Sequence, residues 1–219
     1  MRVSVEAQPA PFQEWLGYEF SDLTDTSAVV ALHWEKVRVP VTISTDTRSL
    51  VLANAKNSYL RGLAGNFWQG WNQAASYCLK SKSGLEDGLA WAEKSVSMNE
   101  NFDNLWVKAG LLENLGREKE SGAARDRAIH FAATESQVNT VGAWYLAAGK
   151  TDDAVAAFKK NLKLHPDSWR AYRALAEGYQ KRGDTSSAIE NYSRALALVK
   201  DEGARKEMEA TLKTLRSRE

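Results

Sequence analysis

The sequence is poor in the residue types that would mark several classes of site. Cys78 is the only cysteine among 219 residues, so an internal disulfide is impossible and a site built from several thiolates is excluded. The apolar neighbourhood of Cys78 predicts a buried, unreactive thiol. The 29 Lys and Arg residues are matched by 28 Asp and Glu residues, so the basic excess typical of nucleic-acid binding is absent. No apolar run reaches the roughly 18 residues of a membrane span. We therefore expect neither a nucleic-acid partner nor a membrane span.

Residues that commonly carry catalysis are few and scattered. The histidines form no spaced cluster with the cysteine or with paired acids, so no metal site is predicted; they are His33, His130 and His165. The chain has neither a glycine-rich phosphate loop nor a Gly-x-Ser-x-Gly elbow. The acid pair Asp152-Asp153 begins a predicted helix, where the helix dipole accounts for it without catalysis. We therefore predict that the chain is not an enzyme and uses no metal or cofactor.

Residues 1–45 have the alternating texture of β-strands. Apolar side chains occupy even positions over residues 30–34 and odd positions over residues 37–43, so the pattern changes phase near Glu35-Lys36. Such a change requires a bulge or a tight turn at that point. We expect three or four strands with one apolar face, which form either half of a β-sandwich or a sheet packed on the helices that follow.

From Asp46 onward the pattern is helical. Asp46 is a suitable N-cap for a linker helix over residues 46–64, which we expect to end near Gly62 or Gly65. Residues 201–219 place apolar side chains on one face of a helix, and we expect this helix to cap the end of the chain. Residues 65–200, between these segments, are predicted to be helices separated by short breaks at Gly84, Gly116, Gly149, His165-Pro166 and Gly183.

A five-residue phrase occurs four times in this helical part. Each copy has a basic residue, a small or polar residue, an apolar residue, any residue and a second apolar residue. The copies occupy residues 94–98, 127–131, 160–164 and 194–198, at successive spacings of 33, 33 and 34. A fixed period of this size is typical of supersecondary units that stack in series. We therefore predict four stacked helical hairpins.

The last two units match residue by residue at a spacing of 34. Their matched pairs are Tyr145 and Tyr179, Gly149 and Gly183, Ala154 and Ala188, and Phe158 and Tyr192. In these positions the sequence resembles the tetratricopeptide repeat (TPR), whose pattern is W-x2-L-G-x2-Y followed by A-x3-F. Together with the strand pattern, the resemblance predicts a mostly α fold: a right-handed α-solenoid of about four TPR-like hairpins plus a terminal helix, preceded by a small antiparallel β segment. The first two units depart from the pattern, since Gly88 replaces the alanine and Arg125 the aromatic residue.

The β segment has a family resemblance of its own. Residues 18–28 and 32–40 are similar to the end of the bacterial family catalogued as domain of unknown function 2911. This resemblance covers residues 2–45 and implies the end of a larger β domain in an exported, periplasmic bacterial protein. The start Met1-Arg2-Val3-Ser4-Val5 runs into strand-like sequence without a signal peptide, as expected of a chain that begins inside a longer protein. Localisation is therefore left open.

The TPR resemblance also implies a binding surface. In that fold the first helix of each hairpin lines a concave groove that grips an extended or helical peptide. The positions expected to face inward are Gln73, Tyr77, Lys80, Trp106, Glu113, Asn139, Ala143, Arg170, Arg173 and Glu177. Tyr77 and Trp106 are candidate aromatic anchors. Arg170 and Arg173 lie one helical turn apart. They either bind one carboxylate together through hydrogen bonds or remain solvated.

Three functions fit these observations. The four-unit period and the lack of catalytic motifs favour a non-enzymatic scaffold that binds a protein or peptide partner in the groove. The alternative is a structural role, in which a strand edge of the β segment pairs with another copy and forms a homo-oligomer. In a third interpretation, activity resides in a larger N-terminal β domain and this chain is its appendage.

Overall fold

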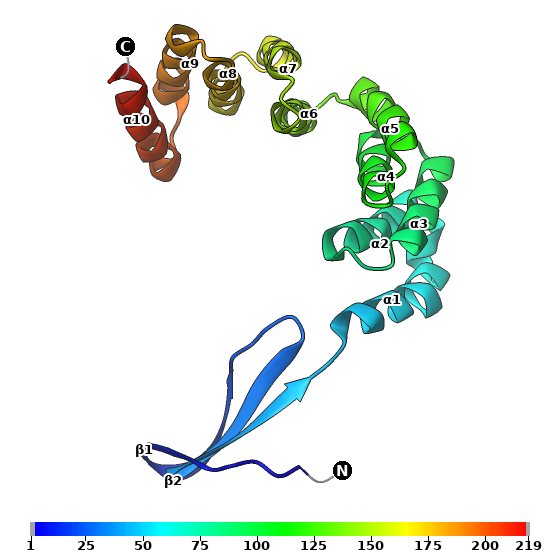
Figure 1. Cartoon of the computed structure of the whole chain (residues 1–219), viewed down its shortest axis with the longest axis vertical. Coiled ribbons are helices and arrows are strands. Elements are labelled where there is room, and N and C mark those ends of the chain that lie inside the picture. The colour runs from blue at the N-terminus through cyan, green and yellow to red at the C-terminus, as the bar shows by residue number, and fades with distance from the viewer. Residues whose placement is uncertain (1–2, 218–219) are drawn as a thin grey trace. The chain divides into compact units, whose positions relative to one another are not determined.

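The computed structural model describes residues 3–217 (Figure 1). They fall into two compact units divided between Met98 and Asn99. Met1 and Arg2, where the predicted strand-like run begins, and the last two residues of the predicted terminal helix lie outside the described residues. The first unit contains β1 (Gln8–Ser21), β2 (Ser27–Ser44), α1 (Thr47–Asn57), α2 (Trp68–Ser81) and α3 (Leu85–Met98). The second contains α4 (Phe102–Asn114), α5 (Glu118–Phe131), α6 (Glu135–Ala147), α7 (Thr151–Leu164), α8 (Trp169–Arg182), α9 (Thr185–Leu198) and α10 (Glu202–Arg216).

β1 and β2 form a two-stranded antiparallel ribbon. The pairing shifts register between Pro9 and Gln13 and again between Gln13 and Gly17, opposite Glu35, whose φ of 52° is left-handed. The irregularity predicted near Glu35-Lys36 is therefore confirmed. The predicted number of strands is wrong, since residues 3–217 contain two strands and not three or four. The phase change lies inside one long strand and does not mark a turn between two.

The ribbon leaves most of its large apolar side chains exposed. Trp15 is 79% exposed, Tyr18 69% and Phe20 68%, whereas Ala31 is the one fully buried residue of the two strands. A sheet packed on helices would bury the large side chains of one face. The described chain therefore does not show the expected packing of the sheet on its helices, and half of a β-sandwich stays a prediction.

The linker segment forms a shorter helix than predicted. Asp46 caps α1 as expected, because its side chain accepts a backbone N–H of the first turn. The helix ends at Asn57 and two 3-10 turns follow, so the predicted end near Gly62 or Gly65 is wrong. The backbone folds back tightly here: a Cβ on Gly65 would lie 2.0 Å from the Leu60 carbonyl oxygen.

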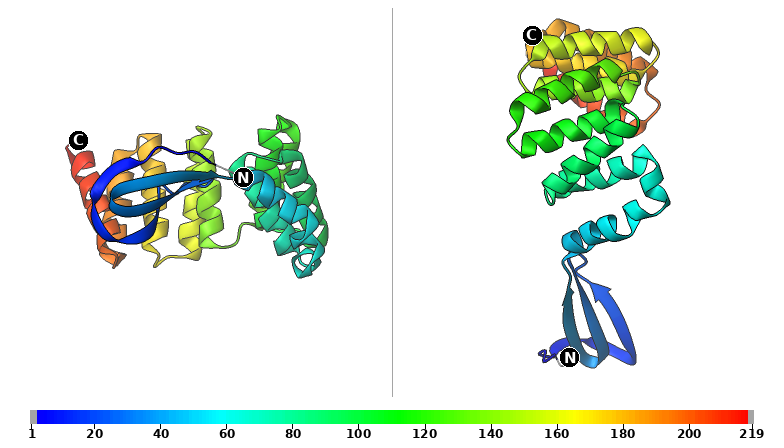
Figure 2. Two further views of the ribbon diagram at one scale, coloured as in Figure 1. Left: turned by 90° about the horizontal axis from the view of Figure 1, so that it is seen from below. Right: turned by 90° about the vertical axis from the view of Figure 1, so that its right-hand side faces the viewer.

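Helices α2 to α9 pair into four antiparallel hairpins, α2 with α3, α4 with α5, α6 with α7 and α8 with α9 (Figure 2). The turn inside each hairpin contains a glycine with positive φ, a conformation that residues with a Cβ rarely adopt; these are Gly84, Gly116, Gly149 and Gly183. Side-chain N-caps begin the later first helices and the terminal helix, at Asn101, Thr134, Ser168 and Asp201. The structure confirms the predicted fold class, a TPR-like α-solenoid with a terminal helix and a preceding antiparallel β segment.

Close helix packing in the third and fourth hairpins depends on small residues set against aromatic ones. Phe158 of α7 is 2% exposed and packs beside Leu175 of α8. A Cβ on Gly142 of α6 would lie 2.3 Å from the Phe158 ring, so the close approach of α6 and α7 requires glycine there. The terminal helix buries its apolar face beside α9 with Met208, Leu212 and Leu215.

The second hairpin holds Arg125 where the third and fourth hold an aromatic residue. Arg125 is 5% exposed, and its guanidinium carbon lies 4.6 Å from the Trp106 ring centroid and 4.8 Å from that of Trp144. Its Nη2 donates to Glu113 Oε2 at 2.6 Å. Burial lowers the pKa of Arg125, while Glu113 opposes this shift. The cation is accommodated because two indole faces and one carboxylate surround it.

Candidate functional site

The predicted groove residues lie on the first helix of each hairpin, as expected, but in different compact units. Gln73, Tyr77 and Lys80 belong to α2 in the first unit. The second unit holds the rest: Trp106 and Glu113 on α4, Asn139 and Ala143 on α6, and Arg170, Arg173 and Glu177 on α8. Among these residues the structure brings those of α6 and α8 into one cleft.

Gln73 and Tyr77 face a pocket that lies between α2 and α1. The pocket has a volume of about 240 Å³, and Ala55 of α1 also lines it. The Tyr59 hydroxyl, from the turn after α1, donates to Gln73 Oε1 at 2.7 Å. The chain's own linker therefore lies along the face of α2 that the sequence assigned to a partner.

Trp106 is engaged by neighbouring side chains. Its ring stacks on Phe102 with centroids 5.1 Å apart and meets the edge of Trp144 at 6.3 Å. Arg125 lies over the same ring, and Glu113, the other α4 candidate, binds Arg125. In this arrangement Trp106 and Glu113 hold Arg125 between the second and third hairpins.

Helices α6 and α8 form the walls of an open cleft of about 290 Å³. Apolar and polar side chains line it together: Asn139, Ala143, Leu146, Phe158, Trp169, Arg170, Arg173, Ala174 and Glu177. A second hollow shares Asn139, Ala143 and Arg170 and continues to Glu135 at the start of α6. The two hollows make one surface along α6, with Asn139 and Arg170 at their junction.

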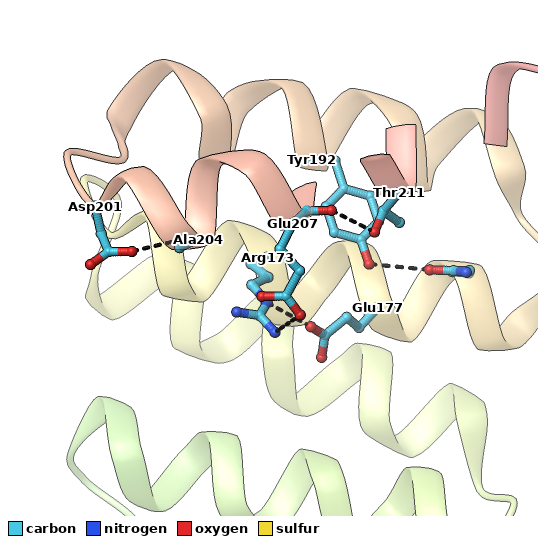
Figure 3. Close-up of polar contacts among 8 residues, drawn as sticks. Arg173, Glu177, Tyr192, Asp201, Ala204, Glu207 and Thr211 are labelled. Atoms are coloured by element: carbon cyan, nitrogen blue, oxygen red, sulfur yellow. Dashed lines mark hydrogen bonds and ion pairs between the residues drawn. The ribbon is translucent and has the colours of Figure 1, made fainter. Parts of the chain in front are cut away.

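The two arginines of the cleft have different surroundings. Figure 3 shows Arg173 between two carboxylates: its Nε donates to Glu177 Oε1 at 2.8 Å and its Nη2 to Glu207 Oε1 of α10 at 3.4 Å. Arg170 is exposed and lies over the Trp169 ring, 4.6 Å from its centroid. Within residues 3–217 Arg170 has no carboxylate partner. Arg170 is therefore the cation of this cleft that is free to receive an anionic group.

Three residues that shape this cleft were not predicted from the sequence. Trp169 supports Arg170, and Glu207 on α10 neutralises Arg173 together with Glu177. Asn161 of α7 is fully buried, and its Nδ2 donates to Asn139 Oδ1 at 2.9 Å. Asn161 had a signal in the sequence, because it stands where two copies of the repeated phrase have alanine. Glu207 had none, since its partner lies on a different helix.

The other candidate chemistry is limited. Among the residues that the structure describes, no group of three or more His, Cys, Asp or Glu side chains is arranged to hold a metal ion. The helices in that part of the chain are too short or too polar to span a membrane. Cys78 is buried, and burial raises the pKa of its thiol to about 11, which confirms the predicted buried thiol.

Comparisons with known proteins agree with this architecture. A family model for the tetratricopeptide repeat matches residues 171–206, from α8 to the start of α10. No curated protein matches the chain. Among solved structures, MamA 41-end from Desulfovibrio magneticus RS-1 is similar with a TM-score of 0.52 and 17% identity, over 72% of this chain and 86% of that chain.

Two further solved structures are similar to the chain. The C-terminal part of a TPR repeat-containing protein from Cytophaga hutchinsonii has a TM-score of 0.55 and 11% identity, over 78% of this chain and 66% of that chain. Pseudomonas aeruginosa pilF has a TM-score of 0.53 and 14% identity, over 68% of each chain. At these identities the likeness establishes the fold. The family model does not reach the β segment. The resemblance of the β segment to the domain of unknown function 2911 therefore stays a prediction.

Proposed function

We propose that the chain is a non-enzymatic scaffold that binds a protein partner through an extended peptide in the cleft between α6 and α8. The observation that carries the proposal is Arg170, an exposed cation without a carboxylate partner in the described chain, at the junction of two hollows. TPR-like solenoids present such surfaces on their first helices. The cleft combines apolar contact area with a small number of placed polar groups, as binding sites commonly do.

The lining residues suggest how a peptide is held. Ala143, which is exposed, and Leu146, which is half-buried, offer an apolar surface to one of its side chains. Arg170, supported by Trp169, pairs with a carboxylate of the peptide through charge-assisted hydrogen bonds. Arg173 is bound to Glu177 and Glu207, so it adds shape to the wall and little charge. The preferred partner therefore carries an acidic side chain or a terminal carboxylate beside a small apolar residue.

The test begins with a random peptide library, from which peptides that bind the whole chain are selected. The enriched peptides are then labelled, and their affinity for the chain is measured by fluorescence anisotropy. Ala143→Arg places a large side chain on an exposed position of the cleft and is expected to abolish binding. Arg170→Ala is expected to weaken it about tenfold, as for a hydrogen-bonded charge. Arg194→Ala, an exposed arginine on α9, is the matched control and leaves affinity unchanged. Wild-type affinity in both cleft variants would overturn the proposal.

A second candidate function, self-association through the ribbon, is supported by its exposed apolar face. Tyr18 and Phe20 on β1 are 69% and 68% exposed, and Trp34 on β2 is 53% exposed. An isolated two-stranded hairpin is only marginally stable in water. Pairing of one strand edge with the ribbon of a second copy would form a four-stranded sheet, on which the rings of the two copies would lie side by side and cover one another in part.

Light scattering across a concentration series tests this second candidate. We expect a dimer mass for the chain and a monomer mass for the double variant Tyr18→Ser and Phe20→Ser. Leu63→Ser changes an apolar residue outside the ribbon that is 81% exposed, and it is expected to leave the dimer intact. A monomer mass for the unmodified chain at every concentration would reject this function.

A further inference from the structure

The second residue of the repeated phrase is the same structural position in all four hairpins. Ser95, Ala128, Asn161 and Ala195 each have 0% exposure. Small residues therefore fill this position in three hairpins, and a carboxamide fills it in the third. Since Ala128 and Ala195 show that a hairpin closes around a methyl group, packing alone does not account for Asn161.

Comparison with the first hairpin separates the contacts that Asn161 makes. Ser95 Oγ donates to the carbonyl of Trp68, the first residue of α2. Asn161 Nδ2 donates to the carbonyl of Glu135, the first residue of α6, at 3.5 Å. A hydroxyl is therefore enough for that bond. The longer carboxamide adds one contact, the 2.9 Å hydrogen bond from its Nδ2 to Asn139 Oδ1.

This contact determines which end of the Asn139 side chain faces a ligand. Asn139 lines both hollows of the cleft. Because its Oδ1 accepts from the buried Asn161, its Nδ2 is the group left to donate, and no acceptor for it occurs in the described chain. A side chain held in one orientation before binding loses less conformational entropy when the ligand arrives.

The same arrangement carries a cost for the fold. Asn161 Oδ1 is buried and has no hydrogen-bond partner in the protein, and a buried acceptor without a partner is destabilising. The alanines at the equivalent position of the second and fourth hairpins avoid this cost. Asn161 is thus better explained by what it does to Asn139 than by the stability of the third hairpin.

We propose that Asn161 is a positioning residue for ligand recognition: it orients the Asn139 carboxamide so that its N–H groups donate to a main-chain carbonyl of an extended peptide in the α6–α8 cleft. The inference rests on the proposed binding function and adds a recognition group to it. Asn139 contacts the peptide, and Asn161 acts only through Asn139.

The matched variants are Asn161→Ser and Asn139→Ala. Serine at residue 161 can keep the contact that Ser95 makes in the first hairpin and is too short to reach Asn139. With a peptide selected on the whole chain, Asn161→Ser is expected to weaken binding about threefold to tenfold, the worth of one hydrogen bond, with an unchanged or higher melting temperature. Asn139→Ala is expected to weaken binding equally, and the double variant no further, because the two residues act as one unit.

Several outcomes would overturn the inference. Wild-type affinity in Asn161→Ser together with weakened binding in Asn139→Ala would show that Asn139 needs no positioning. Additive losses in the double variant, or a loss of affinity that follows a fall in melting temperature, would show a structural role. If Arg170→Ala and Ala143→Arg bind normally, it is the proposed cleft that fails. A measurement without ligand also decides: nuclear magnetic relaxation of the Asn139 side-chain amide should show greater mobility in Asn161→Ser, and equal mobility would reject the inference.

Discussion

Substitution of Gly142 by alanine tests whether the contact between α6 and α7 limits the stability of the third hairpin. The new Cβ would lie 2.3 Å from Cε1 and 2.5 Å from Cζ of Phe158. Phe158 is 2% exposed, so neighbouring side chains enclose most of its ring, and the helices must separate or the ring must leave its rotamer.

The magnitude follows from two opposing effects. Alanine is favoured over glycine inside a helix by about 1 kcal/mol. Overpacking of a closed core costs about 1–3 kcal/mol, and a contact this short belongs at the upper end. We therefore expect Gly142→Ala to lower the free energy of unfolding by about 2 kcal/mol. Because Phe158 also lines the cleft, peptide affinity should fall with it.

Two other helical glycines are matched controls for this substitution. A Cβ on Gly178 of α8 would meet the same ring at 3.0 Å, and a Cβ on Gly122 of α5 would meet nothing within 4 Å. Gly178→Ala should therefore change stability by less than about 1 kcal/mol, whereas Gly122→Ala should stabilise by about 0.5–1 kcal/mol.

Urea denaturation followed by circular dichroism measures all three variants. Equal m-values would show that the same cooperative unit unfolds in each. If Gly142→Ala were as stable as Gly122→Ala, the close approach of α6 and α7 would not require glycine, and the third hairpin would not be limited by the contact with Phe158.

Other consequences of the structure are testable in the same way. Arg125→Ala should destabilise the chain by about 2–4 kcal/mol in urea, because it leaves a cavity between two indoles; Arg125→Phe, which restores the residue type of the later hairpins, should recover part of this loss, and equal stability of both variants would contradict the explanation. Cys78, whose pKa burial raises to about 11, should react with Ellman's reagent at pH 8 only as fast as the chain unfolds; immediate reaction would contradict its burial. The hydrogen bonds from Ser187 hold the pKa of Asp184 below its usual 3.8, so the stabilisation from this ionised N-cap is complete above pH 3.8 and is lost as pH falls through the lower folded value. The urea midpoint of Asp184→Ala should then fall below that of the unmodified chain at pH 7 and approach it in strong acid; a gap that does not depend on pH would contradict the linkage.

Much of the helical architecture could be predicted because its causes are local. Glycine tolerates positive φ at each hairpin turn, as at Gly149 and Gly183, and a side chain such as Asp46 caps a helix through its own first turn. The second residue of the repeated phrase marks one buried position on every second helix. Such features depend on residues within a few positions of one another, so the chain order alone displays them.

Features that depend on distant partners were the ones predicted incompletely. The change of phase near Glu35 indicated an irregularity, but whether it lay within a strand or between two depended on the partner strand. Gln73 and Tyr77 of α2 were predicted to face a partner, yet they share a pocket with α1 and the Tyr59 hydroxyl donates to Gln73. No pattern within one helix says which other helix will cover it.

The cleft shows the same division between local and distant causes. Spacing by one helical turn placed Arg170 and Arg173 together, and that proximity is a property of any helix. Their different states follow from tertiary contacts, since Glu207 approaches from α10 and binds only Arg173. The hydrogen bond that orients Asn139 likewise crosses from α7 to α6. The sequence by itself determined the helices, their period and their candidate faces, because these depend on bonds between near neighbours. Which arginine stays free and how the Asn139 amide is held were decided by the way separate helices pack.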